Sequence, residues 1–204
     1  QILDACLLQL DPIRAPGCDT LATGLFRSAT TGRVVQLSAA NKLPWIAEGQ
    51  QIVSIDGSDL PGQAQADGAL WPTGVWAMLK QAVTVTGDPG RPMAIVLSDF
   101  GNVDHLEAID PVEQPDVKAI LGRYCAPVIE TYATVYLAPT GPMFRASGRF
   151  GSAEFRLTCL ADGIWRASST TVFPRGGMLS FDADATAFSF SSARTWSLRF
   201  QRVD

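Results

Sequence analysis

The chain of 204 residues has few of the features that mark a nucleic-acid-binding, metal-binding or membrane-spanning protein. Its formal net charge is -4 and it has three lysines, whereas nucleic-acid binding needs clustered positive charge. It has one histidine, which leaves few ligands for zinc, and no apolar run approaches the roughly 18 residues of a membrane span. We therefore expect no nucleic acid, membrane, metal or cofactor as a partner.

The usual signatures of a catalytic centre are also missing. No serine has a lysine three residues later, and the sequence contains no Gly-x-Ser-x-Gly motif. His105, the one imidazole, has no serine or cysteine near it in the sequence, so a surface histidine paired to a carboxylate is the favoured interpretation. The tripeptide Asp99-Phe100-Gly101 matches a kinase motif, but the other kinase motifs are absent and a hairpin turn is expected.

The four cysteines fit no metal or redox motif. Cys6, Cys18, Cys125 and Cys159 include no Cys-x-x-Cys pair, and we expect small buried side chains rather than ligands or nucleophiles. Cys125 and Cys159 could form a disulfide if their strands are neighbours. Cysteine usage therefore leaves the cellular compartment open, with the cytoplasm favoured over secretion or a periplasm.

An internal repeat is the most informative feature of the sequence. Three pairs of similar segments occur in the same order, roughly 95 residues apart. The first pair holds Gly24 and Gly122, each followed two residues later by an aromatic residue, and the second pair consists of "DGALW" and "DGIW". The third pair joins residues 94–109 to residues 187–203. The chain therefore contains two similar units.

Each unit reads as all-β. In "TWSLRFQR", Trp196, Leu198 and Phe200 alternate with polar residues, as in a half-buried strand. Turn residues punctuate such runs, which predicts compact antiparallel barrels or sandwiches. We place the two units at residues 20–110 and 111–204, with the boundary in "DPVEQPD". The five tryptophans are spread one per strand region, which favours core filling over an aromatic binding cage.

The first 19 residues differ from the rest. Apolar residues in "ILDACLLQL" suit one face of a short helix, and Pro12 marks its end. This helix either caps the first unit or is the tail of an upstream domain. Because the chain begins with Gln1 rather than Met, we expect that a signal peptide or a whole domain precedes it.

The Gly-x-aromatic opening, the Asp-Gly-Trp centre and the closing Leu-x-Phe strand resemble the two lipocalin-like units that follow the catalytic domain in D-aminopeptidases. These enzymes are penicillin-binding-protein and β-lactamase-like serine hydrolases. The resemblance covers residues 20–203 and implies two consecutive eight-stranded antiparallel β-barrels. It also implies that the catalytic residues lie in an upstream domain, in the same chain or a separate one.

In that family, a loop of the last barrel enters the active-site cleft and helps to select the substrate. The resemblance places this loop at Phe173, Pro174, Arg175 and Gly176, although only Pro174 and Arg175 match the family's pattern. Aligning the repeats by their tryptophans sets "TTVFPR", residues 170–175, against residues 75–80, which read as a strand. Because proline lacks an N–H and Gly176-Gly177 weakens a ladder, a loop or an edge is expected here.

We therefore expect non-catalytic accessory barrels of a D-aminopeptidase-like serine hydrolase, which cover the catalytic domain and shape substrate access. The alternative is a free-standing lipocalin-like module that binds a small apolar ligand. A third interpretation, an independent enzyme using His105 or a cysteine, has the least support. The sequence also permits a homodimer.

Overall fold

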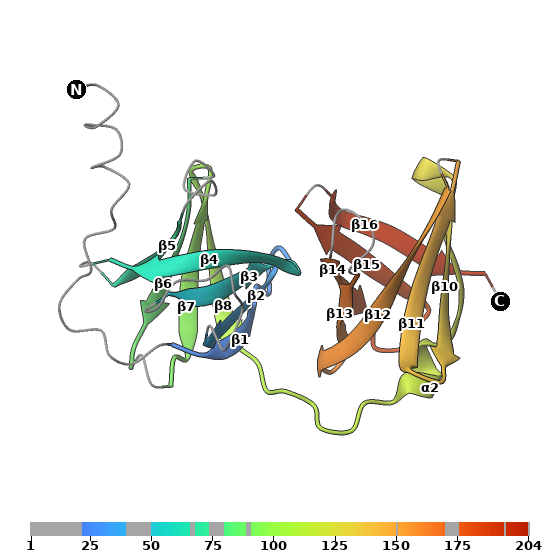
Figure 1. The fold of residues 1–204 in the computed structure, drawn as a ribbon, viewed down its shortest axis with the longest axis horizontal. Helices are drawn as coiled ribbons and strands as arrows, with labels where there is room; N and C mark the ends of the chain where they lie inside the picture. Colours follow the sequence, from blue (N-terminus) through green and yellow to red (C-terminus); the bar gives the residue numbers. More distant parts are fainter. Residues whose placement is uncertain are drawn as a thin grey trace. The chain divides into compact units, whose positions relative to one another are not determined.

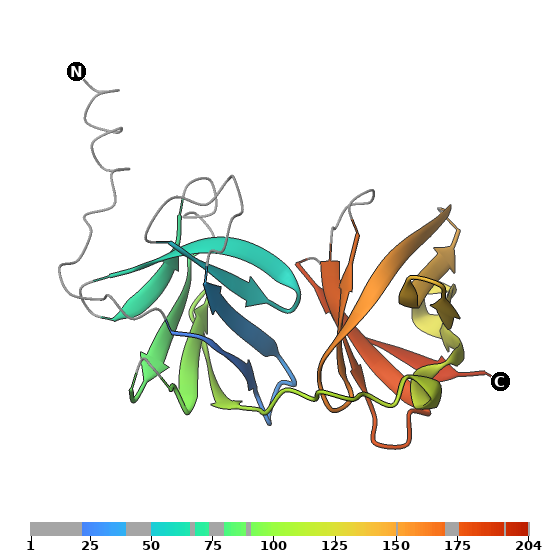
Figure 2. The same ribbon diagram turned by 60° about the horizontal axis from the view of Figure 1, so that its bottom comes forward.

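The computed structural model describes residues 22–39, 50–65, 68–73, 80–88, 91–149, 151–169, 176–193 and 195–203. These residues form two closed eight-stranded antiparallel barrels, one after the other in the sequence (Figures 1 and 2). The all-β class and the tandem eight-stranded barrels are therefore confirmed. The helix expected within residues 1–19 lies outside the described residues, and the short α2 (Val117–Ile120) lies between the two barrels in the sequence.

In the first barrel each strand pairs with the next one along the chain, and the last strand pairs with the first. Its strands are β1 (Gly24–Arg27), β2 (Val34–Ala39), β3 (Gln51–Ile55), β4 (Ser58–Ala64), β5 (Ala69–Pro72), β6 (Gln81–Thr86), β7 (Ala94–Asp99) and β8 (Asn102–Ala108). The barrel closes between β1 and β8, where Phe26 is opposite Ala108.

The second barrel has the same topology and closes between β9 and β16, where Cys125 is opposite Gln201. Its strands are β9 (Gly122–Ala126), β10 (Thr131–Ala138), β11 (Gly141–Gly148), β12 (Gly151–Ala161), β13 (Ile164–Ser168), β14 (Gly176–Phe181), β15 (Ala187–Ser192) and β16 (Thr195–Arg202). A 3-10 turn, η2 (Pro127–Ile129), joins β9 to β10.

The sequence repeat corresponds to this repeated architecture. Gly24 and Gly122 begin β1 and β9, and the third pair of segments falls on β7–β8 and β15–β16. Gly68 and Gly163 both have positive φ and lie directly before β5 and β13. The chain also divides into two compact units with the main boundary between Ala108 and Ile109, and residues 109–116 contain no helix or strand.

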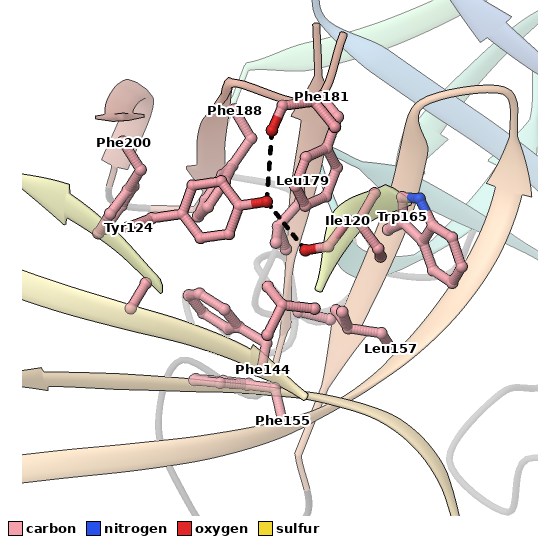
Figure 3. Packing of buried hydrophobic residues seen from close by; sticks show 14 of the residues in the cluster. Ile120, Tyr124, Phe144, Phe155, Leu157, Trp165, Leu179, Phe181, Phe188 and Phe200 are labelled. Atoms are coloured by element: carbon pink, nitrogen blue, oxygen red, sulfur yellow. Dashed lines mark hydrogen bonds between the residues drawn. The ribbon is translucent and has the colours of Figure 1, made fainter. Parts of the chain in front are cut away.

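The interior of the second barrel is filled by aromatic side chains (Figure 3). The Phe188 ring stacks on Phe200 with 4.8 Å between centroids, and it also contacts Tyr124 and Phe144. Such ring pairs add stabilisation beyond the area that they bury. The interior of this barrel is therefore a packed core.

The side chain of Arg202 joins β16, the last strand of the second barrel, to the short helix α2. Its Nη2 atom donates hydrogen bonds to the carbonyl oxygens of Ala119 and Leu121 and to the hydroxyl of Tyr124, at 2.7, 3.0 and 2.7 Å. The guanidinium also lies 5.2 Å from the centroid of the Tyr124 ring. The Tyr124 hydroxyl in turn donates to the carbonyl oxygen of Ile120 at 2.9 Å (Figure 3).

The expectation that tryptophans fill the core holds for Trp165, which is buried, and is wrong for Trp71 and Trp196, which are exposed. "DGALW" has one residue more than "DGIW" between glycine and tryptophan, and side chains alternate along a strand. Leu70 therefore takes the inward position that Trp165 has in the second barrel. Trp45 and Trp76 lie outside the described residues.

Trp196 is turned outward by a bulge. The register between β15 and β16 shifts between Phe190 and Ser192, and Ser197 has φ 50°, a left-handed conformation. A bulge places two residues opposite one and so reverses the inward–outward alternation at that point. The simple alternation predicted for "TWSLRFQR" therefore holds for Leu198 and Phe200 but not for Trp196.

The hairpin expected at Asp99-Phe100-Gly101 is confirmed. Asp99 is opposite Asn102, so Phe100 and Gly101 form a two-residue turn, with φ 50° and 89°. Positive φ at both positions is the geometry of a type I′ turn, which matches the twist of the strands. Across the described residues, no helix is long and apolar enough to cross a membrane.

Candidate functional site

The predicted substrate-shaping loop falls mainly on residues that the structure does not describe. Phe173, Pro174 and Arg175 lie outside the described residues, whereas Gly176 is the first residue of β14 and pairs with Ser168 of β13. In the comparison segment 75–80, the described residue is Lys80, which precedes β6 and is not in a strand. Both segments of the expected contrast between loop and strand thus lie almost entirely outside the described residues.

Gly176 and Gly177 were expected to weaken the pairing of strands. In the structure both belong to β14 and pair with Ser168 and Ala167 of β13. A Cβ atom at Gly177 would lie 2.5 Å from the Phe190 ring, too close for any other residue without a shift. Gly177 therefore makes room for an aromatic ring inside the barrel.

An open depression of about 640 Å³ lies in the second barrel beside the connections from β9 to β10 and from β11 to β12. It is lined by residues of η2, β10, β11 and β12: Pro127, Val128, Ile129, Glu130, Thr131, Ala146, Ser147, Gly148, Arg149, Gly151, Ser152 and Ala153. A Cβ atom at Gly148 would lie 2.7 Å from the Thr131 hydroxyl, so a larger residue there would displace Thr131.

The depression is lined by charged and hydroxyl-bearing side chains as well as apolar ones. Glu130 and Arg149 are its charged residues, and its other polar side chains are the hydroxyls of Thr131, Ser147 and Ser152. No histidine or cysteine is among the described residues that line it, so no hydroxyl there has an imidazole or thiol partner. The charged and hydroxyl groups that line the depression can form hydrogen bonds with polar groups of a ligand or a neighbouring domain.

His105 lies on the outer surface of β8 and is exposed. The carboxylate of its neighbour Asp104 accepts a hydrogen bond from Ser28 Oγ at 2.7 Å and another from Thr31 Oγ1. The carboxylate of Asp99 accepts a hydrogen bond from Arg33 at 2.6 Å and one from Gln81 at 3.0 Å. The Asp104 carboxylate therefore holds the turn between β1 and β2, and the Asp99 carboxylate joins that turn to the start of β6.

The second barrel excludes a disulfide between Cys125 and Cys159. Cys125 lies in β9 and Cys159 in β12, which are not neighbouring strands, and both residues are free thiols. Burial, followed by the negative charge of Asp162, raises the pKa of the Cys159 thiol. Because the thiolate is the nucleophile, Cys159 is poorly suited to catalysis near neutral pH.

A polar cluster lies on the outer face of β10–β12. Glu154 Oε1 accepts hydrogen bonds from Arg145 Nε at 2.7 Å and from Tyr136 Oη at 2.8 Å. These two bonds hold the pKa of Glu154 below its usual value, and the bond to Glu154 raises the pKa of Tyr136. All three groups are accessible to solvent and directed at one another, so the cluster reads as a surface network.

The part of the chain that the structure describes contains no group of three or more His, Cys, Asp or Glu residues able to hold a metal ion. Sequence reasoning missed one unusual residue, Gln51 in β3, whose side chain is buried without a hydrogen-bond partner. The signal was available in "QIVSI", where Gln51 shares the inward phase of Val53 and Ile55.

The chain matches no protein-family model and no curated protein.

Proposed function

We propose that this chain forms the non-catalytic accessory barrels of a D-aminopeptidase-like serine hydrolase. The observation that carries the proposal is the pair of consecutive closed eight-stranded antiparallel barrels, the architecture that the sequence resemblance implies. In this proposal the hydrolase domain itself lies outside these residues.

The packing of the second barrel supports a scaffolding role for that unit. An eight-stranded barrel either fills its interior with side chains or encloses one small ligand. Here Tyr124, Phe144, Phe188 and Phe200 fill it, and each is at most 2% exposed. The second barrel would therefore act through its outer surface and its rim.

In the proposed enzyme, a serine outside this chain forms an acyl-enzyme with an amide or peptide substrate, and water releases the product. The segment from Phe173 to Gly176 would reach the cleft and shape substrate access. Arg175 would face a carboxylate or a peptide carbonyl, because its planar guanidinium offers several donors and keeps its charge in any environment.

Replacement of Arg175 tests this proposal. In the complete hydrolase, Arg175→Ala should lower kcat/KM for a D-alanine amide by about tenfold or more, since it removes a contact made in the transition state. Arg91→Ala, an exposed arginine of the first barrel, is the matched control and should leave kcat/KM unchanged. The Tm of the present chain should hardly change with either substitution.

The same experiment can contradict the proposal in two ways. If the purified chain alone hydrolyses a D-alanine amide, and a substitution within it abolishes that activity, the barrels are not accessory. If Arg175→Ala leaves kcat/KM unchanged but lowers the Tm, Arg175 has a structural role and the substrate-shaping loop is wrong.

A further inference from the structure

Gln51 is a buried side chain whose hydrogen-bonding groups are unpaired. It is the first residue of β3, is 1% exposed, and neither its Nε2 nor its Oε1 atom has a hydrogen-bond partner. A carboxamide has two N–H donors and an oxygen acceptor. Burial without partners costs free energy, because the amide loses its hydrogen bonds to water and gains none.

The side chain of Gln51 lies on the inner face of the first barrel. Side chains of a strand alternate between its faces, so Gln51 shares its face with Val53 and Ile55, which are both buried. On the neighbouring strand, a Cβ atom at Gly62 would lie 2.7 Å from a methyl group of Val53. The glutamine is therefore set in an aliphatic interior.

Among the residues that the structure describes, the strands of the first barrel point smaller side chains inward than the strands of the second. At equivalent positions of the closing strands, Ile95 pairs with Leu106 in the first barrel, where Phe188 pairs with Phe200 in the second. Within the strands of the first barrel, Phe26 is the one buried aromatic residue. In the second barrel the strands bury Tyr124, Phe144, Phe155, Trp165, Phe181, Phe188 and Phe200.

We propose that the first barrel binds one small, mainly apolar molecule that carries an uncharged carboxamide-type group, and that Gln51 pairs with this group. The Nε2–H of Gln51 would donate to the carbonyl oxygen of the ligand, and Oε1 would accept from its N–H. A carboxylate is a poorer ligand, because it has no donor for Oε1 and its charge would be buried.

This inference differs from the accessory function and does not depend on it, because Gln51 and the side chains that share its face, Val53 and Ile55, belong to the first barrel. It assigns the two barrels different tasks. The second is filled by its own aromatic core, whereas the first retains a polar anchor in an aliphatic interior, as a barrel that encloses one ligand requires.

Octanamide is a suitable probe, and the full chain is the protein to use. Isothermal titration should show saturable binding of one octanamide per chain, and Gln51→Leu should weaken it by about tenfold or more. Gln201→Leu, at an exposed position of β16, is the matched control and should bind as the wild type does. Nonan-2-one has a similar length but no N–H donor and should bind more weakly than octanamide.

A second measurement uses the wild-type chain alone. The side-chain NH₂ signal of Gln51, identified by its loss in Gln51→Leu, should shift in a ¹⁵N–¹H NMR spectrum as octanamide is added. Without ligand, Gln51→Leu should raise the Tm by about 4 °C, since it removes an unpaired buried amide.

Three results would overturn the inference. They are a failure of octanamide to bind saturably, equal binding of octanamide to Gln51→Leu, and a Gln51 amide signal that stays unchanged on titration. In each case the amide would be paired with water or tolerated unpaired, and the first barrel would be a scaffold like the second.

Discussion

At the scale of single residues, Arg202 and Tyr124 show how one contact can secure the end of a barrel. Arg202 lies on the last strand, yet its side chain binds backbone oxygens just before the first strand, at Ala119 and Leu121. The Tyr124 ring, over which the guanidinium lies, is fully buried. Its hydroxyl accepts a hydrogen bond from Arg202 and donates one to the carbonyl oxygen of Ile120. The Arg202 guanidinium thereby links the end of the second barrel's sequence to its beginning.

We predict that Arg202→Ala destabilises the second barrel by about 2 kcal/mol, because hydrogen bonds to a charged donor and a cation–π contact are lost together. Arg199→Ala on the same strand is the matched control. It removes an exposed ion pair with Asp182 and should cost less than about 1 kcal/mol. Urea unfolding of both variants measures the difference, and equal losses would contradict the prediction.

At the scale of elements, the turns and the bulge set the register of the strands. The β7–β8 hairpin turns through Phe100, which has φ 50° although its side chain is large and 62% exposed. The bulge in β16 also holds a non-glycine residue at positive φ, Ser197 with φ 50°. Such positions are strained for most side chains.

We predict that Phe100→Asn raises the stability of the first barrel by roughly 1 kcal/mol, since Asn-Gly is a preferred type I′ turn and Asn tolerates positive φ. Little buried area is lost, because Phe100 is mostly exposed. Phe100→Val is the opposite control and should destabilise, because a β-branched residue resists this conformation. Thermal unfolding of the three proteins gives the order, and a less stable Asn variant would count against it.

The elements also show how far the sequence could predict this structure. Alternation and turn residues predicted the β class, and the repeat predicted two similar units, since both are local or self-comparing signals. The outward position of Trp196 was not predictable, because a single bulged residue reverses the pattern. Gln51 was missed for a different reason: its isolation depends on partners that only the folded barrel reveals.

At the scale of the whole molecule, the described residues form two closed barrels, and residues 109–116 join them without helix or strand. Closure pairs the first strand of each barrel with its last, so each barrel's sheet is complete within its own sequence. A closed barrel has no free edge strand that could pair with another chain. Each unit should therefore be self-sufficient.

We predict that a glutamate-specific protease cleaves first after Glu113, which is exposed and lies in the joining segment. Both fragments should keep β-type circular dichroism and unfold cooperatively after separation. Glu113→Gln should abolish this early cleavage without changing the Tm, which is the control. If one fragment unfolds after cleavage, that barrel depends on the other for its stability.

The pairing of Cys125 with Gln201 has a consequence for the time that folding takes. The contact that completes the second barrel joins residues from opposite ends of its sequence, so the chain pays the entropy of closing a long loop before this contact forms. Until then β9 and β16 have open edges and the aromatic interior is accessible to water. We infer that closure is a late and slow step, and that the interval before it is when this chain is most prone to aggregate.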